Sequence, residues 1–184
     1  MPWHYSGSNR PGADTWKHHR KAAVKPTVWL WLFNTGFFEM RWKTGRLFKI
    51  KLSNGGAAFA LALEFPEFAF FNCFNPDATI QEILKSGVLW RLWVMKHVSK
   101  EPGWQPIAVV TDIPKNLLQA TPRFKKDKIS GQYTIYIDGV ESPATKEQCI
   151  GLESAAVWSA LHLQDRLQDH VAGIPNRWVV SLLP

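Results

Sequence analysis

The sequence predicts an α+β fold: a curled, mostly antiparallel sheet, partly barrel-like, with one long C-terminal helix. Two observations predict this fold. Apolar and polar residues alternate on both sides of the turn sequence at residues 53–56, which is the pattern of a β-hairpin. Near the C-terminus, Thr145 and Gln148 have the spacing of a helix capping box, and helical periodicity follows them.

The chain has 184 residues, enough for one domain and an extension. Residues 1–27 are polar, with scattered Gly, Pro and Ser and no apolar periodicity. We therefore expect a disordered or dispensable extension over residues 1–39 and a single α+β domain over residues 40–184. Met40 directly precedes the first clear strand, so it is a candidate for the start of translation.

The first half of the domain is rich in strand patterns. Residues 47–52 and 57–63 form the predicted hairpin, because Asn and Gly at the turn between them tolerate a positive φ. Residues 68–74 are almost all apolar, which indicates a strand buried on both faces. Residues 80–84 are a short helical turn, capped by Asp77 or Thr79.

The second half continues with shorter elements. Residues 88–98 alternate again and predict a strand, and residues 107–110 predict a short core strand. Residues 123–128 are a predicted basic loop, and residues 132–137 are a strand. The C-terminal helix is expected over residues 146–171.

Two glycines indicate where this predicted helix ends and where it is interrupted. Gly173 lies just past its end, as a left-handed cap would. Gly151 lies inside it and predicts a kink or a close contact.

The net charge of +7, with a pI of about 9.5, favours acidic partners. The apolar run at residues 28–38 is too short for a membrane span, which needs about 20 apolar residues. We therefore expect no membrane span and a cytoplasmic protein.

The two cysteines, Cys73 and Cys149, have no Cys-x-x-Cys spacing, which excludes a zinc knuckle. Cys149 lies near the start of the predicted helix, where a thiolate would be stabilised. No base for it is recognisable in the sequence, so a catalytic thiol is not favoured.

No catalytic motif of known mechanism is present. The sequence has no phosphate-binding glycine loop, no Gly-x-Ser-x-Gly and no His-Glu-x-x-His. The basic stretch at residues 123–128, followed by Tyr133 and Tyr136, is compatible with nucleic-acid binding. A charged segment beside a half-exposed strand explains the same residues, so nucleic acid is not a favoured partner.

One polar constellation remains, on one face of the predicted C-terminal helix: His162, Asp165, Asp169 and His170. Imidazole nitrogen and carboxylate oxygen suit a divalent, zinc-like metal ion. Glu153 projects from the same predicted helix, and Arg166 lies among the four. The alternative is a solvated helix face on which Arg166 pairs with its neighbours.

Several segments, in order, have the pattern of a known family. They comprise an opening hairpin, an aromatic second strand, a Gly-x-Trp corner and a C-terminal signature, at residues 45–56, 68–74, 103–107, 145–148, 151–153, 157–158, 166–167 and Gly173. In these segments the chain resembles the immunity protein 26 / phosphotriesterase HocA family, over roughly residues 45–178.

The resemblance implies two different roles. Immunity proteins bind and neutralise a cognate bacterial toxin without catalysis, whereas the phosphotriesterase hydrolyses organophosphate triesters such as coroxon. Inhibitors of basic toxins are usually acidic, because complementary charge speeds encounter. This chain is basic, so the sequence favours a small phosphotriesterase acting on an organophosphate, with a toxin-binding immunity protein as the alternative.

For the hydrolase, a metal-generated hydroxide would attack phosphorus, and a cationic group would stabilise the phosphoryl oxygen. We expect His162, Asp165, Asp169 and His170 to hold the metal, and His162, Asp165, Glu153 and Arg166 to act in catalysis. The resemblance carries over Glu153, Trp158 and Arg166 only as pattern positions. The predicted pocket for an apolar leaving group is lined by four indoles: Trp90, Trp93, Trp104 and Trp158.

Overall fold

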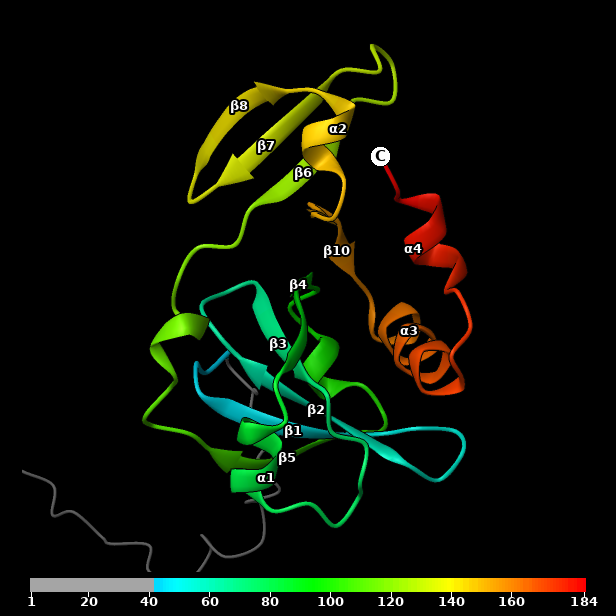
Figure 1. The fold of residues 1–184 in the computed structure, drawn as a ribbon. Helices are drawn as coiled ribbons and strands as arrows, with labels where there is room; N and C mark the ends of the chain where they lie inside the picture. Colours follow the sequence, from blue (N-terminus) through cyan, green and yellow to red (C-terminus); the bar gives the residue numbers. More distant parts are fainter. Residues whose placement is uncertain (1–41) are drawn as a thin grey trace, which may run out of the picture. The chain divides into compact units, whose positions relative to one another are not determined.

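The computed structural model describes residues 42–184, so the expectations for residues 1–39 and for Met40 lie outside the described part of the chain. The predicted fold class is confirmed. The described residues form two mostly antiparallel sheets with a C-terminal helix, and neither sheet closes into a barrel (Figure 1).

The first sheet has six strands in the order β10-β4-β3-β2-β1-β5. All neighbours are antiparallel except β10 and β4, which are parallel. The strands are β1 (Arg46–Lys51), β2 (Ala57–Ala62), β3 (Glu67–Phe71), β4 (Val88–Val94), β5 (Trp104–Val109) and β10 (Val157–Trp158). The predicted hairpin is thus β1–β2, and its turn is held by the Gly56 N–H donating to Asn54 Oδ1 at 2.9 Å.

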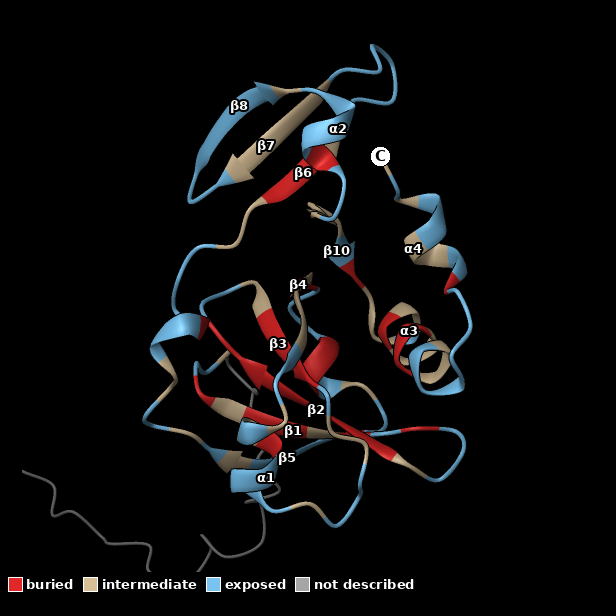
Figure 2. Ribbon diagram, viewed as in Figure 1, coloured by how far each residue is buried: buried red, intermediate tan, exposed pale blue. Residues whose placement is uncertain are grey.

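The centre of this sheet is buried on both faces, as predicted for residues 68–74. Successive residues of β3 point to opposite sides, so Phe68 and Phe70 join one apolar cluster while Ala69 and Phe71 join another. Figure 2 shows the continuous burial of the central strands.

Helices cover the two faces of this sheet. Leu163 and Leu167 of α3 (Ala160–Ala172) and Trp178 of α4 (Arg177–Ser181) pack against the Phe68 cluster. Ile83 of α1 (Ile80–Lys85) and Leu117 of the short helix η2 (Lys115–Leu117) pack into the other. Among residues 42–184, no helix combines the length and the apolar character that crossing a bilayer requires.

The second sheet has the order β8-β7-β6-β9 and is far less buried (Figure 2). Its strands are β6 (Arg123–Lys126), β7 (Tyr133–Ile137), β8 (Val140–Ala144) and β9 (Glu153–Ser154). The predicted basic loop is therefore wrong: residues 123–126 are β6, whose first two side chains are buried. Strand β8 was not predicted, although Asp138 and Gly139, both at positive φ, form its hairpin turn.

The prediction of one helix over residues 146–171 is wrong in its first half. The capping box of Thr145 and Gln148 is present, but it opens only α2 (Lys146–Cys149). Gly151 then adopts a φ of +85°, which ends the helix, and the chain runs extended through β9 and β10. Helix α3 begins after its own cap, Ser159, and ends at Gly173 in the left-handed conformation, as predicted.

Two strand boundaries also differ from the predictions. Strand β4 ends at Val94, and the residues beyond it enter a turn and the short helix η1 (Val98–Lys100). The predicted core strand at residues 107–110 belongs to β5, which is exposed at the edge of the sheet, because among residues 42–184 no further strand pairs beyond it.

Candidate functional site

The four predicted metal ligands on α3 contact other parts of the protein instead of one another. The His162 ring stacks on the Trp178 indole, with centroids 3.9 Å apart. The Trp178 Nε1–H donates to Asp165 Oδ2 at 3.1 Å. Both contacts hold α4 against α3.

The other two predicted ligands, Asp169 and His170, also contact other side chains. Asn176 Nδ2 donates to Asp169 Oδ2 at 2.8 Å, and the Asn176 side chain also accepts the two N–H groups that begin α4. The His170 ring packs against Trp90 and Phe74. We call this set of α3–α4 contacts, made by His162, Asp165, Asp169, Asn176 and Trp178, the α3–α4 clasp.

The side chains of the clasp are engaged with other protein groups. Its imidazole stacks on an indole and its carboxylates accept hydrogen bonds from Trp178 and Asn176. Throughout residues 42–184, no three His, Cys, Asp or Glu side chains are placed to hold a metal together. The geometry of α3 therefore supports a structural role for these side chains.

The structure does bring Glu153 and Arg166 together. Arg166 Nη2 and Nη1 donate to the two Glu153 carboxylate oxygens at 2.6 and 3.1 Å. The Arg166 guanidinium is also 4.2 Å from the Trp90 ring centroid and 4.9 Å from that of Trp158. With only 4% of its surface exposed, Arg166 is a buried cation held by one carboxylate and two indole faces.

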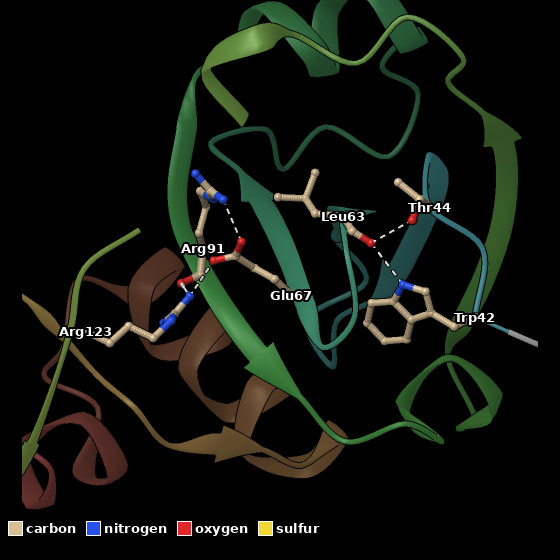
Figure 3. Close-up of polar contacts among 6 residues, drawn as sticks. All are labelled: Trp42, Thr44, Leu63, Glu67, Arg91 and Arg123. Atoms are coloured by element: carbon tan, nitrogen blue, oxygen red, sulfur yellow. Dashed lines mark hydrogen bonds and ion pairs between the residues drawn. The ribbon is translucent and has the colours of Figure 1, made fainter. Parts of the chain in front are cut away.

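A second ionic cluster was missed in the sequence. Arg91 Nη2 donates to Glu67 Oε2 at 2.6 Å, and Arg123 Nη2 donates to Glu67 Oε1 at 2.5 Å (Figure 3). Arg123 Nη2 also donates to the Arg91 carbonyl at 2.9 Å. One carboxylate therefore lies between two guanidiniums.

Arg123 is the more deeply buried of the two. Its side chain is 1% exposed and its guanidinium lies 4.9 Å from the Trp93 ring centroid. Burial lowers the pKa of Arg123, and the Glu67 carboxylate opposes that effect. Burial of this kind is strongly unfavourable without a partner, so Glu67 fixes where Arg123 can lie.

The two clusters meet at the parallel pairing of β6 with β9, where Arg123 lies beside Glu153. The attraction of Glu153 also raises the pKa of Arg123, against the larger effect of burial. We call the five residues Glu67, Arg91, Arg123, Glu153 and Arg166 the Arg–Glu network. It contains three guanidiniums and two carboxylates, so it carries one excess positive charge.

Two hollows flank this network and share Arg91 and Thr121 in their walls. The first has a volume of ≈360 Å³ and is lined by Glu67, Arg91 and Arg123, with Trp93 and Tyr136 as aromatic wall. The second has a volume of ≈420 Å³ and is lined by Trp90, Arg91 and Glu153, among other residues. We call them the Arg123 hollow and the Glu153 hollow.

The four tryptophans predicted to line one pocket are dispersed. Trp93 and Trp90 line the two different hollows. Trp104 lies beside a third hollow of ≈440 Å³, next to Lys49 and Lys51. Trp158 is buried beneath Arg166. An apolar leaving group would therefore meet at most one of these indoles in each hollow.

The sequence carried one signal for the missed cluster. Arg91 interrupts the otherwise apolar strand β4, in which Val, Leu and Trp occupy the other positions. A charged residue in such a strand needs a partner, and the antiparallel register places Glu67 of β3 diagonally across from it. Glu67 was hard to recognise because it begins a strand directly after a turn.

Cys149 is not an activated thiol. It lies at the last residue of α2, not near the start of a long helix, and it is fully buried. Burial raises the pKa of this thiol, which disfavours the reactive thiolate.

A comparison of the chain with protein-family models, with curated proteins and with solved structures finds no match.

Proposed function

We propose that this chain is a binding protein of the immunity type, which recognises a partner protein through the surface that contains the neighbouring Arg123 and Glu153 hollows. The two hollows share Arg91 and Thr121, and we call this surface the groove. The observation that carries the proposal is the composition of that groove. Trp90, Trp93, Arg91 and Tyr136 line it while partly exposed. Trp, Tyr and Arg are the residues that contribute most to the affinity of protein interfaces.

The resemblance to immunity protein 26 supports the same proposal. Its C-terminal signature includes Glu153, Trp158 and Arg166, and these three residues are in contact: Glu153 bonds Arg166, whose guanidinium packs on Trp158. The excess positive charge of the network would favour a partner that presents acidic groups.

The test uses the product of the gene adjacent to this chain's own gene, because a toxin and its immunity protein have to be inherited together. An inactive form of that product would be titrated with the full chain by calorimetry. Trp93→Ala and Arg91→Gln should each weaken binding about tenfold or more, as hot-spot truncations do. Lys51→Gln, an equal loss of charge outside the groove, should change affinity by less than about twofold.

The proposal fails if no complex forms, or if the groove variants bind as tightly as the unmodified chain. Both variants should first show the circular dichroism spectrum of the unmodified chain, so that a loss of binding reports on the groove.

A second function, hydrolysis of organophosphate triesters, is favoured by one observation. Glu67 lies between two guanidiniums in a hollow with an aromatic wall. Guanidiniums would stabilise charge on a phosphoryl oxygen, and Trp93 and Tyr136 would contact an aromatic leaving group. Such an activity would be located at Glu67, away from the α3–α4 clasp.

Hydrolysis of a chromogenic organophosphate, with and without chelator, tests this second function. Glu67→Gln and Arg91→Gln should abolish turnover, whereas the double variant His162→Ala, His170→Ala should retain it. Absence of turnover above a buffer blank removes the hydrolase from consideration.

A further inference from the structure

We infer that the Arg123 hollow is a binding site for a carboxylate carried on an aromatic ring. The inference goes beyond partner binding, since a small aryl carboxylate would occupy this hollow in the free chain, where no partner protein covers it.

The first support is charge. The floor of the hollow holds two guanidiniums and one carboxylate, and both guanidiniums bond the same carboxylate of Glu67. Glu153 also attracts Arg123, but both of its oxygens are bonded to Arg166, so the whole Arg–Glu network keeps one excess positive charge. The two guanidiniums exceed the Glu67 carboxylate by one charge and would attract one negative group locally, although Glu64 and Asp138 at exposed positions of the lining oppose the approach of a more highly charged ligand.

The second support is a set of unused donors. Arg123, 99% buried, lines the hollow, and its Nη1 has no acceptor among residues 42–184. The Arg91 Nε is likewise buried without an acceptor in the described part of the chain. These two donors belong to different arginines and are enclosed by protein atoms, so a ligand would bond them once the Arg91 side chain shifts outward. Buried donors are nearly always bonded, which favours such a shift.

Of the two guanidiniums, that of Arg91 is the one that a ligand would reach first. Its side chain is 14% exposed and lines the hollow, whereas Arg123 lies behind it. A carboxylate would therefore bond Arg91 directly and extend toward Arg123.

The aromatic walls of the Arg123 hollow would favour a ligand that carries an aromatic ring. Trp93 and Tyr136 meet edge to face with centroids 5.3 Å apart, and Phe65 is 53% exposed at the rim. The volume of ≈360 Å³ is within the range of small-molecule pockets. An aromatic ring fits this wall, and its carboxylate would point to the floor.

The rim sets a limit on ligand charge. Glu64 and Asp138 line the hollow at exposed positions. They would repel a dianion more than a monoanion, so a phosphate monoester should bind more weakly than a carboxylate of the same size.

The test is a tryptophan-fluorescence titration of the full chain with 4-nitrobenzoate, 4-nitrophenyl phosphate and neutral 4-nitrobenzamide. Saturable binding should follow the order benzoate, then phosphate, then no binding of the amide. Arg91→Gln should weaken benzoate binding about tenfold, and Lys51→Gln by less than about twofold. Glu67→Gln should tighten it about threefold or more, because the variant removes the carboxylate that competes for both guanidiniums.

Three results would overturn the inference: no saturation by 4-nitrobenzoate up to about 10 mM, tighter binding of the phosphate than of the benzoate, or equal weakening by Arg91→Gln and Lys51→Gln. If Arg91→Gln does not fold, Trp93→Phe decides the question: it should lose most of the fluorescence response, and an unchanged response would overturn the inference. A failure here would leave the binding of a partner protein to the groove untouched, and a missing partner would leave this titration unaffected.

Discussion

The guanidinium of Arg166 meets the carboxylate of Glu153 through two hydrogen bonds, at 2.6 and 3.1 Å, between residues 13 positions apart in the chain. This pair joins the second sheet to α3. Trp90 and Trp158 enclose the guanidinium from the first sheet. One ion pair thus connects three parts of the fold.

The first prediction concerns the stability that this pair contributes. Arg166→Ala should lower the free energy of unfolding by about 3–5 kcal/mol, because it leaves the Glu153 carboxylate without its partner and opens space between two indoles. Arg177→Ala is the matched control. The Arg177 side chain is 75% exposed, and its loss should cost at most about 0.5 kcal/mol. Urea denaturation measures the free energy of unfolding of both variants. Equal losses in the two would contradict the stabilising role given to the Arg166–Glu153 pair.

The second prediction concerns Gly45, which turns the chain into β1 at a φ of +84°. A Cβ there would lie 2.3 Å from the Val110 carbonyl oxygen, and the Val110 N–H donates to the Gly45 carbonyl. Gly45→Ala should therefore be far more destabilising than Gly131→Ala, where φ is also positive but no atom lies within 4 Å of the added group. The control should cost only the left-handed strain, about 1–2 kcal/mol.

Thermal unfolding compares these two glycine variants. A smaller loss for Gly45→Ala than for Gly131→Ala would show that the Val110 contact does not constrain the turn.

At the C-terminus, the elements that depend on neighbouring residues were predicted and those that depend on long-range pairing were not. The capping box and the cap at Gly173 are local patterns, and each was predicted from neighbouring residues. The break at residues 150–158 was not. It depends on β9 pairing with β6 and β10 pairing with β4, which are contacts between segments far apart in the sequence.

The same distinction explains the candidate site. Helical spacing correctly placed His162 and Asp165 on α3, but spacing cannot reveal that α4 would cover them. Arg123 appeared to belong to a solvated basic segment, because its partner Glu67 lies 56 positions away. Long-range ion pairs of this kind leave no periodic signal in one sequence.

The third prediction concerns the α3–α4 clasp. Asn176 is buried, accepts two N–H groups at the start of α4 and donates to Asp169. Asn176→Ala should lower stability by about 1–2 kcal/mol through loss of the cap, and Asn116→Ala, at an exposed position, by less than about 0.5 kcal/mol. If the two variants melt at the same temperature, the clasp does not hold α4.

The fourth prediction concerns thiol reactivity. Cys73 is half-buried, and Cys149 is fully buried with a raised pKa. At pH about 8.5, where an ordinary thiol is half ionised, Cys149 should still be protonated in the folded chain. A chromogenic disulfide reagent should therefore modify Cys73 much faster than Cys149, and raising the pH further should speed the Cys149 reaction.

Denaturant provides the control for this experiment. In urea, both thiols should react at one rate, because burial is lost. Equal rates in the folded chain would contradict the environment described for Cys149.

The most direct measurement of where this protein binds is a single titration series with 4-nitrobenzoate, in which Arg91→Gln is compared with the double variant His162→Ala, His170→Ala. The groove at the Arg–Glu network should be the binding site and the α3–α4 clasp a structural element. Arg91→Gln should then weaken binding about tenfold while the double variant, if folded, binds like the unmodified chain. Retained affinity in Arg91→Gln together with loss in the double variant would contradict this assignment.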